Sequence, residues 1–159
     1  MAQVEAPPDG TRGAGGFIEK QITYKIQYFL HVPLYKLTGG LIGHRLGKIT
    51  TLLLTTTGAK SGLPRQLGLN YRRDGDNFII VASKGGATKH PMWYRNLLAN
   101  PECEVQAGRE KVRCRARTAT AEEKPRLWAL MLENYKPYDH YQESTDREIP
   151  VVILEPIRA

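Results

Sequence analysis

A glycine turn between two β-type segments constrains the fold of this chain more than any other feature of its sequence. Asp74-Gly75 separates segment 66–73 from segment 77–83, and a β-branched, uncharged run precedes both at 49–57. Asp-Gly between such segments is typical of a two-residue hairpin turn, and β-branched residues favour strands. The sequence therefore predicts three consecutive strands, the last two of which pair antiparallel.

A second hairpin is predicted farther along the chain. Segments 102–107 and 110–118 both suit strands, and Gly108-Arg109 joins them. A two-residue turn determines the register and places Cys103 opposite Cys114. A cross-strand disulfide is conceivable between them, but two reduced thiols are the expected state of a cytoplasmic protein.

Two helices and one further strand complete the predicted domain. A short helix is expected at 91–100 and a longer one at 121–134. A tyrosine-rich loop at 135–141 then leads to a last strand at 149–154. Five or six short strands with few helices indicate a mainly β (α+β) fold, a small barrel with peripheral helices over residues 48–159.

The N-terminal part has a different composition. Residues 1–16 combine prolines and glycines with few apolar side chains, which predicts a disordered tail. Residues 17–47 form a helical segment in which 17–37 has amphipathic spacing, with Pro33 as an interruption and Gly39-Gly40 as the end. Its apolar stripe consists of Ile18, Ile22, Ile26, Phe29 and Leu30. Such a helix either packs on the domain or lies on a membrane surface, and the sequence leaves both open.

The net charge of +7 is concentrated in the first half of the chain. From Phe17 to Arg65 the chain has seven lysines and arginines and one acidic residue. From Thr118 onward it has five lysines and arginines and eight acidic residues. A basic excess favours an anionic partner, which is a nucleic acid, a membrane surface or a phosphorylated small molecule. Nucleic acid is the weakest of these, because the cations are not interleaved with aromatic residues on one element.

Several other classes are excluded. No apolar run approaches the roughly 18 residues that a spanning helix needs, and the first residues do not resemble a signal peptide. A cytoplasmic protein, at most peripheral at the inner face of the cell membrane, is therefore expected. The four histidines have no metal-ligand spacing, so no metal site is predicted. Neither a nucleophile elbow nor a GxGxxG fingerprint occurs.

The first candidate site is the turn that follows the run at 49–57. Gly58 and Gly62 let the backbone curl so that N–H groups converge. Lys60, Ser61 and Arg65 add two cations and a hydroxyl, which are groups that bind phosphate. An ordinary hairpin loop with solvated charges is the alternative.

The second candidate follows the strand at 77–83. Gly85 and Gly86 beside Lys84 permit close approach of the backbone to a flat ligand, and Met92 and Trp93 could line one side of it. Taken alone, Trp93 is more simply a core residue.

The third candidate is a set of tyrosines, Tyr135, Tyr138 and Tyr141. Their hydroxyls can donate hydrogen bonds to a substrate oxygen. Such tyrosines are also common in packed surface turns.

In order and spacing, these residues resemble the deazaflavin-dependent nitroreductase family, reductases that use coenzyme F420. The resemblance runs from about Thr51 to Pro156. The motifs that carry it are Gly58-Ala59-Lys60-Ser61-Gly62, Pro64-Arg65, Ala82-Ser83-Lys84-Gly85-Gly86, Pro91-Met92-Trp93-Tyr94 with Asn96, Asn100-Pro101, the tyrosine set and Thr145-Asp146-Arg147-Glu148-Ile149-Pro150. It implies an FMN-binding-type split β-barrel with reduced F420 as the cofactor and no metal.

The resemblance also implies where the coenzyme lies. Its phosphate-bearing tail would be held by Ala59, Lys60, Ser61, Arg65, Gln66, Leu67, Gly68, Leu69 and Asn70. The deazaflavin ring would be held by Val81, Ala82, Ser83, Lys84, Met92, Trp93, Tyr94, Arg95 and Asn96. Tyr138 would close over the ring, and Tyr135 and Tyr141 would face the substrate beside Ser83.

The expected reaction is hydride transfer from the reduced coenzyme to an electron-poor acceptor such as a quinone, an activated enone or lactone, or a nitroaromatic. One alternative is a split barrel that uses FMN. Another is a non-catalytic deazaflavin carrier or membrane-surface binding protein. The oligomeric state is open, since edge strands and an amphipathic helix can both serve self-association.

Overall fold

The structure is a computed structural model, and it describes residue 30, residues 32–46 and residues 49–158. The expected tail at 1–16, and most of the helix expected from residue 17, lie outside the described residues. Within them, Leu30 and residues 32–37 are helical and the chain turns at 38–43, which agrees with a helix end at Gly39-Gly40. No helix in the described part of the chain is both long and apolar enough to cross a membrane.

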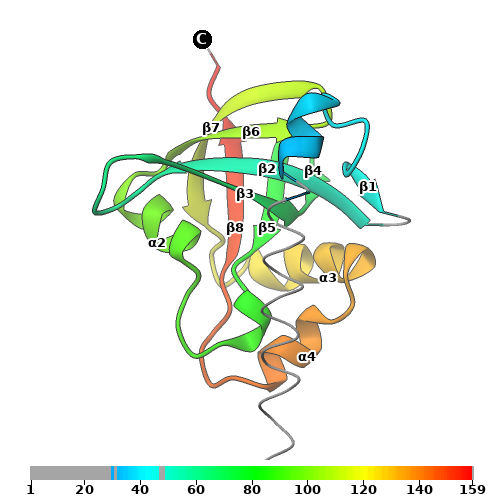
Figure 1. Ribbon diagram of the computed structural model, residues 1–159. Coiled ribbons are helices and arrows are strands. Elements are labelled where there is room, and N and C mark those ends of the chain that lie inside the picture. The colour runs from blue at the N-terminus through cyan, green and yellow to red at the C-terminus, as the bar shows by residue number, and fades with distance from the viewer. Residues whose placement is uncertain (1–29, 31, 47–48, 159) are drawn as a thin grey trace, which may run out of the picture.

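An antiparallel sheet of eight strands forms the body of the described chain (Figure 1). The strands are β1 (Arg45–Leu46), β2 (Ile49–Thr57), β3 (Pro64–Asn70), β4 (Arg72–Asp74), β5 (Asn77–Val81), β6 (Glu102–Ala107), β7 (Glu110–Thr118) and β8 (Val151–Pro156). Their order in the sheet is β1-β2-β6-β7-β8-β5-β4, and β3 pairs with β2 outside this path. The curled sheet with a branch at β2 is the expected split barrel.

Besides the helical residues before 38, three α-helices and one short 3₁₀ helix lie among the described residues. They are η2 (Lys84–Gly86), α2 (Met92–Ala99), α3 (Lys124–Asn134) and α4 (Tyr138–Glu143). Helices α3 and α4 lie together at one end of the sheet, and α2 lies on the side of the β2–β3 turn (Figure 1).

Both hairpins form as expected, and the strand at Ile49–Thr57 has the expected bounds. In the second hairpin Cys103 is opposite Cys114 and both thiols are free. Their surroundings make them weak nucleophiles, because burial raises the pKa of Cys103 to about 12 and that of Cys114 to about 11.

The strand expected at 66–73 is not continuous, which corrects the expectation. The chain leaves β2 at Asn70, passes through Tyr71 and pairs with β5 from Arg72 onward. The buried amide of Asn134 occupies this corner, where its Oδ1 accepts from the Thr50 N–H at 3.1 Å and its Nδ2 donates to the Tyr71 carbonyl at 3.2 Å. A side chain from α3 thus satisfies backbone groups that a continuous ladder would have paired.

Smaller differences concern element bounds and one additional strand. Residues 121–123 form a turn, so α3 begins at Lys124, and the segment expected to be a loop at 135–141 contains the start of α4. The last strand begins at Val151 rather than at residue 149. The short strand β1 was not expected, because a two-residue strand has no periodicity to detect.

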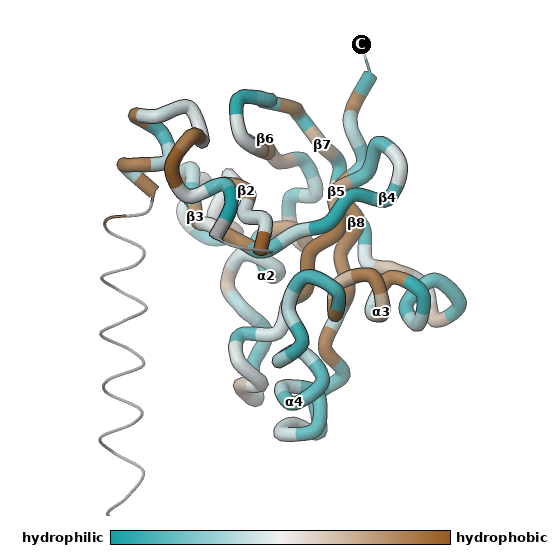
Figure 2. Tube along the Cα trace, turned by 90° about the vertical axis from the view of Figure 1, so that its right-hand side faces the viewer, coloured by the Kyte–Doolittle hydropathy of each residue, from teal (hydrophilic) through white to brown (hydrophobic). Residues whose placement is uncertain are grey.

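Two hydrophobic clusters share the central strands β5 and β8. Phe78 and Ile80 face the barrel interior, whereas Ile79 and Val81 face α3 and α4. Strand β8 alternates in the same way, so residues 78–81 and 151–154 form continuous apolar runs, as the hydropathy colouring shows (Figure 2). Because β5 is held on both faces, the segment that follows it starts from a rigid position.

Tyr35 anchors the described part of segment 17–47 on the barrel. Its side chain is fully buried, and its hydroxyl accepts a hydrogen bond from the Gly108 N–H at 2.6 Å. Gly40 packs on the same turn so closely that a Cβ there would lie 2.5 Å from the Cα of Gly108. Of the two readings left open for this segment, the described residues therefore support packing on the domain for Tyr35 and Gly40.

Candidate functional site

The β2–β3 turn is closed by its own backbone and by one side chain from α2. The Gly58 N–H donates to the Leu63 carbonyl and the Gly62 N–H to the Gly58 carbonyl, both at 2.8 Å. The buried Asn96 accepts from the Ala59 N–H at 3.0 Å and donates to Thr56 Oγ1 at 3.1 Å. The turn is thus held at a set position relative to α2.

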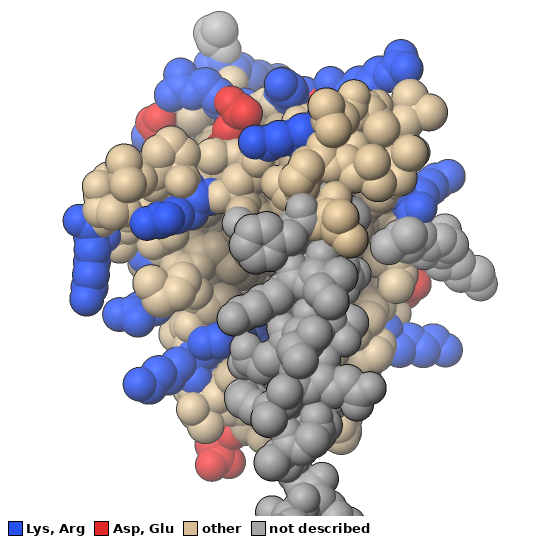
Figure 3. Space-filling view, in the orientation of Figure 1, with Lys and Arg blue, Asp and Glu red and all other residues tan. Residues whose placement is uncertain are grey.

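Cations without ionic partners surround this turn and the start of α2. Within the described residues, no carboxylate forms an ion pair with Lys60, Arg65, Lys84, Lys89 or Arg95. By contrast, the arginines of β7 pair with Glu102, Glu123 and Glu155. Figure 3 shows blue side chains along the side of the molecule that carries the turn and α2, with few red ones among them. An anionic ligand would meet little repulsion there.

The segment after β5 turns back sharply. Ser83 is in the right-handed helical region, and Lys84, Gly85 and Gly86 follow with φ of +47°, +63° and +78°. Lys84 is the one non-glycine residue with positive φ among the described residues. Alternation from right-handed to left-handed conformation directs successive N–H groups to one side, a geometry that binds anions and carbonyl oxygens. Strain of this kind is common at functional sites.

The same turn contacts α4. A Cβ on Gly86 would lie 2.3 Å from Ser144 Oγ and 2.8 Å from the Tyr141 carbonyl, so only glycine allows this approach. The expected ring-binding turn and the expected tyrosine set, about fifty residues apart in sequence, are therefore in direct contact.

The three tyrosines form one cluster. The hydroxyls of Tyr135 and Tyr141 are hydrogen-bonded at 3.0 Å, and the rings of Tyr135 and Tyr138 are 5.0 Å apart at 67°. Tyr138 is buried among Ile79, Val81 and the core residues of α3, whereas Tyr135 and Tyr141 are half-buried. Two phenol groups thus stand at the surface on a rigid apolar base.

Arg147 holds the 82–87 turn through hydrogen bonds to its backbone. Its guanidinium donates to the carbonyls of Ala82, Ser83 and Ala87 at 3.2, 2.8 and 2.9 Å, and to His90 Nδ1 at 2.8 Å. Because arginine only donates, His90 Nδ1 must be an acceptor and the ring is neutral. Burial lowers the pKa of His90, and the charge of Arg147 lowers it further. Burial lowers the pKa of Arg147 as well.

The remaining expected site residues differ in exposure. Four of them are buried core residues: Val81, Ala82, Trp93 and Tyr94. The Trp93 side chain is therefore part of the core, which was the simpler interpretation of this residue. Met92 is exposed at the start of α2 and accepts a contact from Arg95 at 3.8 Å. Ser61 Oγ accepts from the Leu63 N–H at 3.3 Å. Along β3 the residues from Gln66 to Asn70 are half-buried, with Leu67 and Leu69 packed on the core.

The sequence reasoning missed the side chains that hold the site together. Arg147 stands out in the sequence only as part of a motif, and the loop-fixing role of Thr56 and the corner role of Asn134 had no sequence signal. The described residues contain no cluster of metal-ligating side chains.

The residues present fit an anionic ring coenzyme. A Cβ added at Gly62 or at Gly85 would meet no atom within 4 Å beyond the adjacent residues, so both turns are open on that side. Cations without ionic partners flank both, and a tyrosine pair stands beside the second. A split barrel with these features defines an oxidoreductase of the flavin- and deazaflavin-binding class.

Comparison with known proteins identifies the family within this class. The family model described as "F420H(2)-dependent quinone reductase" matches residues 27–156. The F420H(2)-dependent quinone reductase Rv1261c of Mycobacterium tuberculosis is 46% identical over 129 residues, covering 79% of this chain and 87% of that protein.

Two solved structures agree. An F420-H2-dependent reductase, FDR-A, is 46% identical with a TM-score of 0.62, covering 66% of this chain and 93% of that one. A protein described as a domain-swapped dimer is 38% identical with a TM-score of 0.65, covering 89% of this chain and 98% of that one. The chain belongs to the F420H(2)-dependent quinone reductase family. It is therefore an F420-dependent oxidoreductase, as the sequence resemblance implied.

Proposed function

We propose that this chain transfers a hydride from reduced F420 to a quinone bound between the Lys84 turn and the tyrosine pair. Family membership supports the reaction class, and the contact of Gly86 with Tyr141 is the observation that carries the location. That contact packs a turn suited to a ring ligand against the backbone of α4, the helix that carries Tyr141. Other electron-poor acceptors, such as enones, lactones and nitroaromatics, have the same requirement for a polarised oxygen or nitro group.

Each group in this site has a distinct role. Lys60 and Arg65 neutralise the phosphate-bearing tail of the coenzyme, and Ser61 donates a hydrogen bond to it. The bound coenzyme supplies the hydride. The hydroxyls of Ser83, Tyr135 and Tyr141 hydrogen-bond the acceptor oxygen as negative charge develops there. Tyr135 or water then delivers the proton that completes reduction. Tyr138 closes over the deazaflavin ring from α4.

Quinone reduction by the full chain tests the proposal. Reduced F420 and menadione are mixed with the protein, and oxidation of the coenzyme is followed by its returning fluorescence. Saturable turnover is expected. Absence of both coenzyme binding and turnover would refute the function, and turnover with FMN plus a nicotinamide donor would favour the flavin alternative.

A second candidate property is binding to a membrane surface, where quinones partition. The observation that favours it is an apolar patch on the described N-terminal residues, visible as brown segments at the outer edge of Figure 2. The patch consists of Leu30 (68% exposed), Leu34 (43%), Leu37 (85%), Leu41 (72%) and Ile42 (51%). Lys36 and Arg45, both exposed and without ion pairs among the described residues, lie in the same segment.

Pelleting with vesicles tests this property. The double variant Leu37→Ser with Leu41→Ser should pellet less with anionic vesicles than the unmodified chain, because apolar insertion and charge attraction act together. Leu98→Ser, which removes an exposed leucine from α2, is the matched control. Equal pelleting of all three proteins would reject the patch as the anchor.

A further inference from the structure

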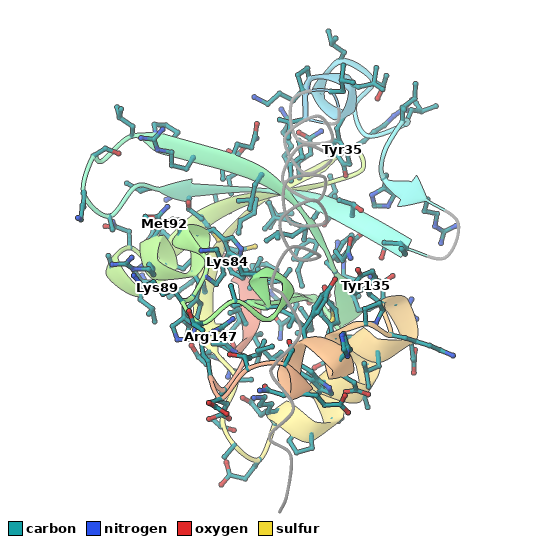
Figure 4. The ribbon with its side chains drawn as sticks, turned by 60° about the horizontal axis from the view of Figure 1, so that its bottom comes forward. Tyr35, Lys84, Lys89, Met92, Tyr135 and Arg147 are labelled. Carbon is teal, nitrogen blue, oxygen red and sulfur yellow. The ribbon has the colours of Figure 1, made fainter. Side chains whose placement is uncertain are left out.

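Arg147 is a cation enclosed by neutral acceptors. Three backbone carbonyls and His90 Nδ1 receive its hydrogen bonds, all between 2.8 and 3.2 Å. No carboxylate of the described residues lies within ion-pair distance of it. Its charge is therefore not cancelled locally and acts on the peptide groups that it contacts. Figure 4 shows Arg147 on the same side of the molecule as Lys84 and Lys89.

Two of these carbonyls belong to peptide groups of the turn that follows β5. The Ala82 carbonyl shares its peptide plane with the Ser83 N–H, and the Ser83 carbonyl shares its plane with the Lys84 N–H. A hydrogen bond to a carbonyl polarises the N–H of the same peptide and makes it a stronger donor. Among the described residues no hydrogen bond from either N–H is found, and the conformations of Ser83 and Lys84 direct both to one side.

We propose that Arg147 is a positioning residue for hydride transfer, which fixes the 82–87 turn and polarises the N–H groups of Ser83 and Lys84 toward the reacting ring and its acceptor. The proposal rests on the proposed function, because it assigns a second role within the same site. The charge acts most strongly when negative charge develops during transfer, so it stabilises the transition state more than the bound coenzyme. A residue that only held the loop would affect coenzyme binding and catalysis alike.

The test compares Arg147→Met with Arg147→Lys in the full chain. Three quantities are measured: kcat with menadione at saturating reduced F420, the Kd of oxidised F420 and the Tm. Arg147→Met is expected to lower kcat about tenfold, the scale of one charge-assisted hydrogen bond, with the coenzyme Kd within about threefold of the unmodified value. Arg147→Lys retains a cation behind the Ser83 carbonyl and should recover most of the lost kcat.

Arg113→Met is the matched control, since Arg113 is exposed on β7 and pairs only with Glu102. It should leave kcat and Kd unchanged. An unchanged kcat in Arg147→Met overturns the proposal. So does a loss of coenzyme affinity that accounts for the whole loss of activity and that lysine does not restore. Failure of the proposed function is a different result, because the unmodified chain would then neither bind the coenzyme nor turn over.

Discussion

The side chain of Asn96 on α2 accepts a hydrogen bond from the backbone N–H of Ala59 at 3.0 Å, across 37 residues of sequence. Its Nδ2 donates to Thr56 Oγ1, which lies at the end of the strand that leads into the same turn. One buried amide thus joins the proposed tail-binding turn to the helix that begins beside the proposed ring site. The two parts of the coenzyme site are coupled through this contact.

Asn96→Ala should therefore lower the free energy of unfolding and weaken coenzyme binding together. Removing the amide leaves the buried Ala59 N–H without its partner and takes away the bond to Thr56 Oγ1, which costs about 1–3 kcal/mol. Urea denaturation measures the stability loss, and fluorescence titration measures the coenzyme Kd. Asn100→Ala, at the exposed end of α2, is the control and should change neither quantity. A stable Asn96→Ala protein with unchanged affinity would disprove the coupling.

The double variant Lys60→Ala with Arg65→Ala should raise the Kd of F420, because both cations lack ionic partners among the described residues and flank the same turn. The difference from the unmodified chain should shrink as salt is added, since screening weakens the lost attraction. Titrations at low and high salt measure it. Lys111→Ala with Arg158→Ala removes two exposed cations elsewhere, and a similar rise in its Kd would show that only net charge matters.

Stability should decrease as the pH falls below about 6.5. The folded chain lowers the pKa of His90 from 6.5, so at acid pH the unfolded chain binds a proton there that the folded chain does not. Stability is then complete above the unfolded pKa and is lost as the pH falls toward the folded one. Urea denaturation between pH 5 and pH 8 measures the slope, which should be shallower in His90→Gln. An identical slope would remove His90 as the cause.

Tyr135→Phe and Tyr141→Phe should each lower kcat with little change in the free energy of unfolding. Each variant removes one member of the hydroxyl pair but keeps the ring contacts at 5.0–6.4 Å. Loss of one donor to a developing oxyanion costs about 10²–10³-fold in kcat. Steady-state kinetics with menadione measures the loss. Trp128→Phe, which breaks the bond to Asp139 on the far side of the cluster, tests whether any change in the cluster has the same effect.

The hairpins were predictable because their information is local. The glycine turns and the alternation of adjacent residues determined β6–β7 and its register down to the pair Cys103 and Cys114. The start of α3 and the bounds of β8 were less predictable, since capping turns and strand ends depend on neighbouring elements. The division of the strand at Tyr71 could not be predicted, because it requires the amide of Asn134 from a helix more than sixty residues later.

The candidate site likewise has features that the sequence predicted and features that it did not. Glycine, lysine and serine in short turns predicted two candidate ligand-binding segments, because a close backbone approach and a phosphate need those residue types, but an ordinary hairpin loop was left open as the alternative. Their resemblance to a reductase family then named the coenzyme, and the family comparison confirmed it. The sequence did not show which side chains face solvent. Trp93 and Tyr94 are residue types that suit a ring site, but both are buried.

The sequence by itself determined the β-rich class, the paired hairpins, the cationic turns and the family. Only the tertiary structure decided that Gly86 meets Tyr141, that Asn96 holds Ala59, and that Arg147 stands behind Ser83. The physical reason is the sequence distance over which each interaction acts. Turn and strand preferences act between neighbouring residues, whereas a guanidinium bonded to three carbonyls some sixty residues away exists only after the barrel has closed and brought those segments together.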